Sequence, residues 1–314
     1  MGRRFDVLVV GMQVIDLLVM GASPEVFECE TYNAQDIQLL MGGDALNQAV
    51  STSMLGGNIA LMGVVGNDRL GGVLMNQLAN YPLTVFNPVI ESRTGISIVL
   101  CKEDGHRHFI LQPGHNEYFS YRHVDERVVR DSKIVSIGSC MALPSFDGED
   151  TIRLLDYARS VGTISAMDTK INRKEYDMPP ILESLKHVDY LLPSEADVKI
   201  LTGVDDGPEH MVEALHDMGV KNVILKLGDK GCYVSADGMK KAVAPYPAKS
   251  IDTTGAGDAF TGAFLYAKAR GWDVEECARF ANAAGAVSIE SPGACGVIRS
   301  EAQVLERMKR GQLW

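Results

Sequence analysis

Basic residues are in short supply in this sequence, which excludes proteins that bind polyanions over a broad surface. The 314 residues include 30 Lys and Arg against 41 Asp and Glu, a formal net charge of −11 at pH 7. Nucleic-acid-binding proteins usually have a basic surplus, because contacts with phosphates supply much of their affinity. An anionic membrane surface repels the same excess of acidic groups. We therefore expect neither a nucleic-acid partner nor a membrane partner.

Patterned cysteines are also lacking. The six cysteines are scattered, with no Cys-x-x-Cys pair and no regular spacing. Scattered thiols are typical of a reduced, cytoplasmic protein rather than of a disulfide framework. Their spacing also gives no zinc site.

Long, uninterrupted apolar segments are missing as well. Residues 45–67 and 70–90 carry no charge, but Gly, Asn and Gln interrupt both. Near the start, two arginines precede an apolar stretch, in which Asp6 and Asp16 would be costly for a secretory signal. We expect no membrane-spanning helix and no signal peptide. The Walker A, GxGxxG, HExxH and GxSxG patterns are absent too, which removes the usual motif arguments for several enzyme classes.

Short runs of Val, Ile and Leu alternate with longer stretches of helical spacing. Such runs are typical of strands buried on both faces of a parallel sheet. The longer stretches end near glycines, as helices commonly do. This alternation predicts an α/β fold with a doubly wound, mainly parallel sheet. The predicted strands are residues 7–10, 59–64, 134–137, 163–166, 190–192 and 223–226, and the predicted helices are 44–55, 150–160 and 208–218.

Two segments break this alternation and predict a small β lid. The first, residues 12–40, suits short strands better than helices. The second, residues 93–111, contains two β-rich runs on either side of Glu103-Asp104-Gly105, which is typical of a hairpin turn. The α/β domain then comprises residues 1–11, 41–92 and 112–314.

The most informative motif is a glycine-rich segment followed by small and apolar residues at helical spacing. Gly255, Ala256 and Gly257 fall where a loop becomes a helix, so unpaired backbone N–H groups and the helix dipole would favour an anion there. Asp258 follows directly, and a carboxylate there would repel a phosphate unless it transfers a proton. Beside an anion hole, it can take a proton from a hydroxyl during phosphoryl transfer. The alternative is an ordinary N-terminal Asp that interacts with the helix dipole.

A second glycine motif precedes a predicted helix. The pair Gly42 and Gly43 exposes backbone N–H groups, and Asn47 lies one turn into the helix with both donors and an acceptor. This combination suits a polyhydroxylated ligand. A tight turn with an internally satisfied Asn47 explains the same residues about equally well.

Asp168 and Arg173 follow a predicted strand at its carboxyl end, where α/β proteins place their ligands. They are either ligands for substrate or nucleotide, or a surface ion pair.

Together the two glycine motifs resemble the signature regions of the ribokinase-like (PfkB) carbohydrate kinases, and the similarity extends over nearly the whole chain. The resemblance implies the ribokinase-like fold with a β lid. It also implies ATP- and magnesium-dependent transfer of the γ-phosphoryl group to a hydroxyl of a sugar or sugar derivative. Further matching segments are Asp16 after the first strand, residues 189–197, 201–203, 226–231 and 281–284, and Gly293.

The resemblance implies roles for individual residues as well. It makes Asp258 the general base and Gly255, Ala256 and Gly257 the anion hole. The sugar would bind to Asp16, Gly42, Gly43, Asn47 and Asp258. The nucleotide would bind to Ser194, Lys226, Gly228, Gly231 and Asn282. A monovalent cation such as K⁺ would be held, largely through backbone oxygens, at Asp252, Thr254, Ser288, Ser291 and Gly293.

Three positions depart from the family pattern. Ser194-Glu195-Ala196-Asp197 stands where the family usually has Asn-x-x-Glu. Asp197 is one methylene shorter than Glu, so it would reach magnesium through water, with the ion bound mainly to the ATP phosphates. Val297 replaces a side chain that sometimes helps to hold the cation, which leaves dependence on K⁺ open. Asp44 adds a negative charge to the sugar-facing turn.

Two further functions are alternatives: a nucleoside kinase of the same fold, and a non-catalytic sugar or nucleotide sensor. The presence of Asp258 argues against the sensor. Exposed strand edges in the lid would allow a homodimer through the lid. We expect the lid to select the substrate, around Ile98, His106 and His108.

Overall fold

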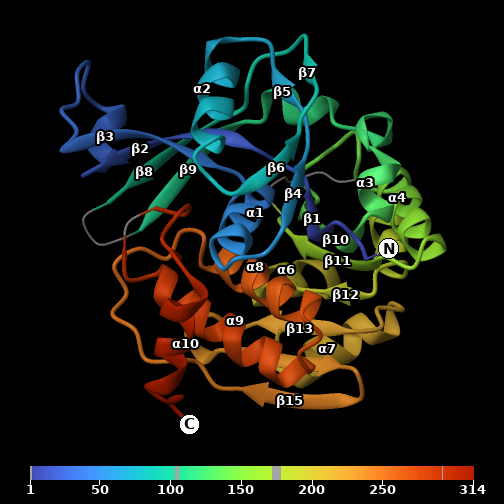
Figure 1. Ribbon diagram of the computed structural model, residues 1–314. Coiled ribbons are helices and arrows are strands. Elements are labelled where there is room, and N and C mark those ends of the chain that lie inside the picture. The colour runs from blue at the N-terminus through green and yellow to red at the C-terminus, as the bar shows by residue number, and fades with distance from the viewer. Residues whose placement is uncertain (1, 103–105, 172–177, 292) are drawn as a thin grey trace.

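One nine-stranded sheet runs through the centre of the molecule (Figure 1). The computed structural model describes residues 2–102, 106–171, 178–291 and 293–314. In sheet order the strands are β15 (Met239–Val243), β14 (Cys232–Ala236), β13 (Val223–Lys226), β12 (Tyr190–Leu191), β11 (Ile164–Thr169), β10 (Ser132–Cys140), β1 (Phe5–Val10), β4 (Ile59–Met62) and β6 (Leu83–Phe86). From β13 to β6 every neighbouring pair of strands is parallel, whereas β14 and β15 form an antiparallel edge.

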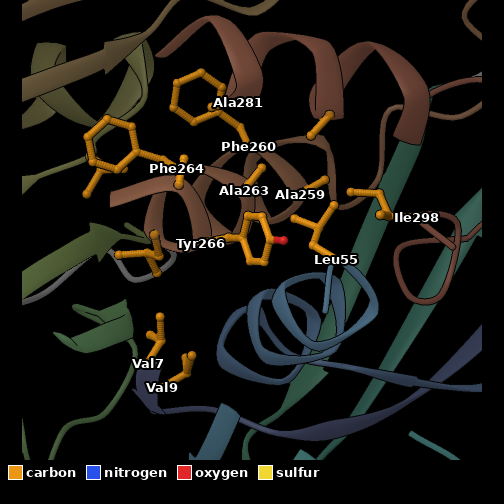
Figure 2. Close-up of a cluster of buried hydrophobic side chains, with 14 of the residues drawn as sticks. Val7, Val9, Leu55, Ala259, Phe260, Ala263, Phe264, Tyr266, Ala281 and Ile298 are labelled. Atoms are coloured by element: carbon orange, nitrogen blue, oxygen red, sulfur yellow. The ribbon is translucent and has the colours of Figure 1, made fainter. Parts of the chain in front are cut away.

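Helices cover both faces of this sheet. Successive side chains of β1 point to opposite faces. Val7 and Val9 pack in the core with helices α8 (Ala256–Ala269) and α9 (Val274–Ser288) (Figure 2), whereas Leu8 and Val10 belong to the core on the other face. The first core is covered by α1 (Asp44–Met54), α2 (Arg69–Leu78), α8 (Ala256–Ala269), α9 (Val274–Ser288) and α10 (Glu301–Lys309). The second is covered by α3 (Glu126–Arg130), α4 (Glu149–Ser160), α5 (Met178–Leu185), α6 (Glu195–Thr202) and α7 (Pro208–Asp217). This architecture confirms the predicted doubly wound α/β fold.

Strand β11 extends beyond its predicted end. Its last residues, Asp168 and Thr169, are polar, so the apolar run that marks the strand in the sequence stops before them. Both side chains are nevertheless buried, and Asp168 pairs there with Lys226. The ion pair explains why a charged residue ends a buried strand.

A second sheet, which we call the small sheet, lies to one side of the first (Figure 1). Its order is β3 (Asp36–Gly42), β2 (Val14–Met20), β8 (Ile96–Cys101) and β9 (Arg107–Gln112). Strands β2 and β8 are parallel, and the two outer pairs are antiparallel. The predicted turn at 103–105 lies outside the described residues. Shorter elements are β5 (Val65–Gly66), β7 (Val89–Ile90) and the 3₁₀ turns η1 (Pro24–Phe27), η2 (Gly114–Tyr118), η3 (Tyr121–His123) and η4 (Gly228–Lys230).

Three general sequence expectations can be compared with the structure. None of the helices within the described residues is long and apolar enough to cross a membrane. All six cysteines carry free thiols. The small sheet is built from the two segments in which short strands were expected, and the proposed domain boundaries remain a prediction.

Two glycines bring the start of α1 close to the sheet and to α8. A Cβ atom on Gly138 of β10 would lie 2.7 Å from Ala45 Cα, and one on Gly262 of α8 would lie 2.9 Å from Gln48 O. Thr52 Oγ1 donates to Gly262 O (3.1 Å) at the same contact. The backbones can therefore approach closely only because these side chains are missing.

We expect the Gly138→Ala substitution to reduce the free energy of unfolding by about 1–3 kcal/mol, because the added methyl overpacks the contact with α1. The measurement is urea unfolding followed by circular dichroism. The control is Gly72→Ala on the exposed side of α2, where a Cβ atom would meet nothing within 4 Å. That change should stabilise the helix by up to about 1 kcal/mol. Equal stability of the two variants would contradict the prediction.

Candidate active site

A cleft of about 940 Å³ lies between the small sheet and the carboxyl ends of the central strands. This is where parallel α/β sheets hold their ligands. The small sheet contributes Val14, Asp16, Ser97, Arg107, Phe109 and Leu111. The α/β domain contributes Gly43, Asp44, Asn47, Asp168, Thr169, Lys170, Ser194, Asp197, Lys226, Gly228, Thr253, Thr254, Gly255, Gly257, Asp258 and Ala294, and Met12 and His106, which directly precedes β9, complete the lining.

Asp258 lies in the first turn of α8 and is almost completely buried. Asn47 Nδ2 donates to its Oδ2 (2.9 Å), and Gln48 Nε2 lies 3.3 Å from its Oδ1. Both amides come from the first turns of α1, so two helix N-termini converge on one carboxylate. The structure thus joins the two glycine motifs, which are 211 residues apart between Asn47 and Asp258.

The pKa of Asp258 is raised well above its usual range. The main cause is burial, and the carboxylates of Asp44 and Asp168 raise it further. The hydrogen bond from Asn47 and the charge of Lys170 act in the opposite direction. A carboxylate whose pKa is raised in this way binds a proton more readily than an exposed Asp, which suits a general base.

A buried charge network lies beside Asp258. Lys226 Nζ donates to both oxygens of Asp168 (2.7 and 2.8 Å), which also accepts from Thr261 Oγ1 (2.8 Å) and Gln48 Nε2 (3.1 Å). Burial still raises the pKa of Asp168, although Lys226 opposes this. Of the two readings offered by the sequence, the surface ion pair is wrong for Asp168; Arg173 lies outside the described residues.

Lys170, at the carboxyl end of β11, adds a second cation to the cleft. The nearby Asp44 carboxylate is the main reason that the pKa of Lys170 is raised, and partial desolvation of the ammonium group in the cleft opposes this rise. Asp44 is half-buried and desolvation raises its pKa, while its buried Oδ2 has no hydrogen-bond partner among the described residues. The negative charge of Asp44 therefore faces Lys170.

The glycine-rich segment begins α8 in the expected position. Gly255 is the N-cap, with φ of 73°, and an added Cβ would lie 2.7 Å from Ala294 O. Only glycine combines this left-handed backbone with such a close approach. The Ala256 N–H donates to Thr253 O (3.2 Å) in a turn, while Gly255 and Gly257 line the cleft.

On the small-sheet side, Asp16 faces the cleft from β2. Burial raises its pKa to about 6, Ser97 opposes the rise through a hydrogen bond, and Asp44 adds to it. Gly42 lies behind Asp16, since a Cβ at Gly42 would lie 2.0 Å from Asp16 Oδ2. Gly43 caps α1 with φ of 98° and lines the cleft.

The residues expected to bind nucleotide fall into two groups. Lys226, Gly228 and Ser194 line the cleft, with Ser194 as the N-cap of α6. Gly231 and Asn282 do not line it. Asn282 Nδ2 instead donates to Val243 O (3.0 Å) and Ala244 O (3.1 Å), which attaches α9 to the end of β15.

Asp197, the expected magnesium residue, lies at the edge of the cleft with its carboxylate fixed by three donors. Ser194 Oγ (2.7 Å) and Thr169 Oγ1 (3.0 Å) donate to Oδ2, and the Ile171 N–H donates to Oδ1 (3.2 Å). Within the described chain, no group of three or more His, Cys, Asp or Glu side chains could hold a metal ion. Asp197 would therefore act on a metal bound mainly by another ligand.

The expected monovalent-cation residues are only partly grouped. Gly293 N–H donates to Asp252 Oδ2 (2.8 Å), and Thr254 N–H donates to Asp252 Oδ1 (2.7 Å). Ser288 Oγ donates to Gly285 O (2.8 Å) within α9. Ser291 lines a separate hollow of about 350 Å³.

Comparison with known protein families identifies the family of this chain. The profile of the pfkB family carbohydrate kinases matches residues 4–300. The chain belongs to the PfkB family of carbohydrate kinases. As a member it is a phosphotransferase with an alcohol group as acceptor.

Similar proteins agree with this assignment. A ribokinase from Haemophilus influenzae is 28% identical over 88% of this kinase and 90% of the relative. Fructokinase-1 from Oryza sativa is 26% identical over 98% and 99% of the two chains. A crystal structure of ribokinase from Thermotoga maritima has a TM-score of 0.83 at 27% identity, covering 97% of this kinase and 99% of that chain. The structure of Arabidopsis thaliana ribokinase complexed with ribose and ATP has a TM-score of 0.81 at 29% identity, covering 98% and 99%.

Among the residues that sequence reasoning missed, Lys170 and Arg107 line this kinase's cleft, and Gln48 and Thr261 donate hydrogen bonds to its buried carboxylates. Lys170 offered one usable signal, because it directly follows a predicted strand at the ligand-binding edge of the sheet. Of the three residues expected to select the substrate, His106 lines the cleft, whereas Ile98 and His108 do not. His108 alternates with Arg107 and Phe109 along β9, so it lies on the other face.

We expect Asn47→Leu to move the acidic limb of the kcat/KM profile to higher pH. The amide stabilises the ionised form of Asp258, so its loss raises the pKa of the carboxylate further. A general base must be ionised to accept a proton. As the pH is lowered, the variant should therefore lose activity at a higher pH than the unmodified enzyme. The shape of the profile, measured by steady-state kinetics, is independent of any loss in sugar affinity. Asn67→Leu, at an exposed amide that bonds Glu91, should leave the limb in place; an unshifted limb in Asn47→Leu would refute the prediction.

Proposed function

We propose that this kinase transfers the γ-phosphoryl group of ATP to a hydroxyl of a small sugar or sugar derivative, with Asp258 as general base. The observation that carries the proposal is a buried carboxylate of raised pKa, facing the cleft in the first turn of a glycine-capped helix. Such a carboxylate can accept a proton where the helix N-terminus stabilises an anion. The ribose and ATP bound by the Arabidopsis relative support this pair of substrates.

In the proposed reaction the sugar lies between Asp258, Asn47 and Asp16. Asp258 takes the hydroxyl proton while the hydroxyl oxygen attacks the γ-phosphorus in line; the new O–P bond forms as the bond to ADP breaks. The backbone at Gly255 and Gly257 faces the transferred group. The ammonium groups of Lys226 and Lys170 add positive charge to the same cleft.

The remaining assigned residues would support the nucleotide and its metal. Asp197 fits the hydration shell of magnesium, because three donors fix its carboxylate and lone pairs remain for water. Magnesium bound to the ATP phosphates would neutralise part of their charge. Ser194 would act by holding Asp197, and Gly228 would line the nucleotide pocket. Gly231 and Asn282 would shape that pocket from behind.

We assign the small sheet the role of a lid over the sugar. Its inner face carries Asp16, Ser97 and Phe109 into the cleft, so its closure would exclude water that could otherwise hydrolyse ATP. The six free thiols suit a reducing compartment, and we place the reaction in the cytoplasm.

The direct test is ADP release across a panel of sugars, sugar acids, polyols and nucleosides. For the best substrate, we expect Asp258→Asn to lower kcat by about 10²–10⁴-fold, because proton removal is lost while the volume is kept. Asp131→Asn, at a half-exposed carboxylate outside the cleft, should keep full activity. Full activity of Asp258→Asn would refute the role of the base. If a nucleoside were the best substrate, the protein would be a nucleoside kinase rather than a sugar kinase.

We also propose a homodimer in which the outer face of the small sheet contacts a second copy. Strand pairing places Leu17 opposite both Leu39 and Ile98, and Ile98 opposite Ile110. Cross-strand partners share a face, so these apolar residues lie together on the face opposite Asp16. Ile37, Leu39 and Ile110 are 62%, 40% and 50% exposed, which is unusual for a sheet face that stays in water. We therefore place the dimer contact on this outer face rather than at the exposed strand edges of the small sheet.

We expect sedimentation at micromolar concentration to give twice the mass of the 34.1 kDa chain. Ile110→Asp should reduce it to the monomer, because a buried, unpaired carboxylate would destabilise the contact. The matched control is Ile200→Asp at a residue of α6 that is 59% exposed, which should remain dimeric. A monomeric unmodified protein, or a dimeric Ile110→Asp, would overturn the proposed interface.

A further inference from the structure

Arg107 connects the small sheet to the loop that begins α8. It is the first residue of β9, and its Nη2 forms an ion pair with Asp252 Oδ1. The two side chains are 13% and 4% exposed, so the pair is largely removed from water. In Figure 1 the paired strands β8 and β9 run toward the segments before α8 and after α9.

Asp252 is the point where three segments meet. Its Oδ1 accepts from Thr254 N–H as well as Arg107, and its Oδ2 accepts from Gly293 N–H. Gly255 then rests on Ala294, the neighbour of Gly293. The position of Gly255, the N-cap of α8, therefore depends on contacts made by Asp252.

The monovalent cation implied by the fold family fits poorly beside this carboxylate. Both oxygens of Asp252 are already engaged, one of them by a guanidinium charge. A guanidinium in contact with Asp252 would also repel a cation held by the backbone oxygens around this carboxylate. The positive charge that Asp252 requires is present in the chain itself.

We propose that Arg107 is a positioning residue that supplies this charge from the small sheet, so that the anion-hole loop is ordered when the sheet covers the cleft and needs no added monovalent cation. A buried carboxylate without its cationic partner is strongly unfavourable. Loss of Arg107 should therefore displace the Thr253–Asp258 segment (residues 253–258) that carries Gly255 and Gly257. A displacement of about 1 Å in such a segment can cost about 10²-fold in rate.

The inference rests on the proposed function, and its first test is kinetic. In Arg107→Ala we expect kcat to fall about 10–100-fold with little change in the KM of the sugar. Guanidinium chloride at millimolar concentration should restore part of the activity, whereas urea, of similar shape but uncharged, should not. The control Arg69→Ala removes the same charge from the exposed start of α2. An unchanged kcat in Arg107→Ala, or equal rescue by urea, would overturn the role of the charge.

Two further measurements identify Asp252 and the cation. The double variant Arg107→Ala with Asp252→Asn should lose no more activity than the worse single variant, because both changes remove one interaction. If the activity losses of the two single variants were instead additive in the double variant, Arg107 would act on the substrate rather than through Asp252. The unmodified enzyme should be equally active in potassium and choline chloride; a strict need for potassium would overturn the proposal.

Hydrogen exchange provides a readout that needs no activity. Amides of residues 253–258 should exchange faster in Arg107→Ala than in Arg69→Ala, with the rest of the described chain unchanged. Equal protection of this segment would refute the inference even if the enzyme were active. If the unmodified protein released no ADP with any acceptor, the proposed function would fail while the exchange result still decided the role of Arg107.

Discussion

The burial of one carboxylate where two helices begin is the constraint on which the site depends. Asp258 can stay ionisable there only because the start of α1 provides Asn47 and Gln48 as donors. Those donors reach it only because Gly262 lets the two helices touch. The helix that carries Asp258 can begin at that position only with the left-handed Gly255. The contact at Gly262, the backbone conformation of Gly255 and the pKa of Asp258 therefore depend on one another.

The same cleft shows how an acidic protein can accept a triphosphate. The carboxylates of the buried Asp168 and Asp258 and of the half-buried Asp44 all have raised pKa values, and the net charge of the chain is −11. Lys226 is bonded to Asp168, while Lys170 faces Asp44. The ion pair with the buried Asp168 holds Lys226 in a fixed position before any ligand arrives, so less ordering of this lysine is needed on binding. In the proposed reaction, phosphate binding thus depends on a few placed charges and backbone N–H groups rather than on overall charge.

Much of the fold and part of the candidate site could be predicted from the sequence, because both have local sequence patterns. Apolar runs such as residues 223–226 predicted buried parallel strands, because burial on both faces leaves no polar alternation. Gly255 and Asp258 were found because the start of a helix has a local pattern. Lys170 and Arg107 were not found, because their roles depend on partners far away in the chain, Asp44 and Asp252. The polar end of β11 was missed for the same reason: Asp168 is buried only because Lys226 is present.

The small sheet shows why strand register matters more here than composition. Along β9, Arg107 and Phe109 face the cleft while Ile110 lies on the outer, apolar face. A slip of one residue would exchange the two faces, moving the guanidinium into the proposed dimer contact and an isoleucine toward the sugar. Strand β9 therefore contributes side chains to the cleft, to the loop before α8 and to the outer surface. A change in its register would alter all three sets of contacts together. The residues that fix the register, from Asp16 opposite Ser97 to Cys101 opposite Arg107, are in this sense part of the site.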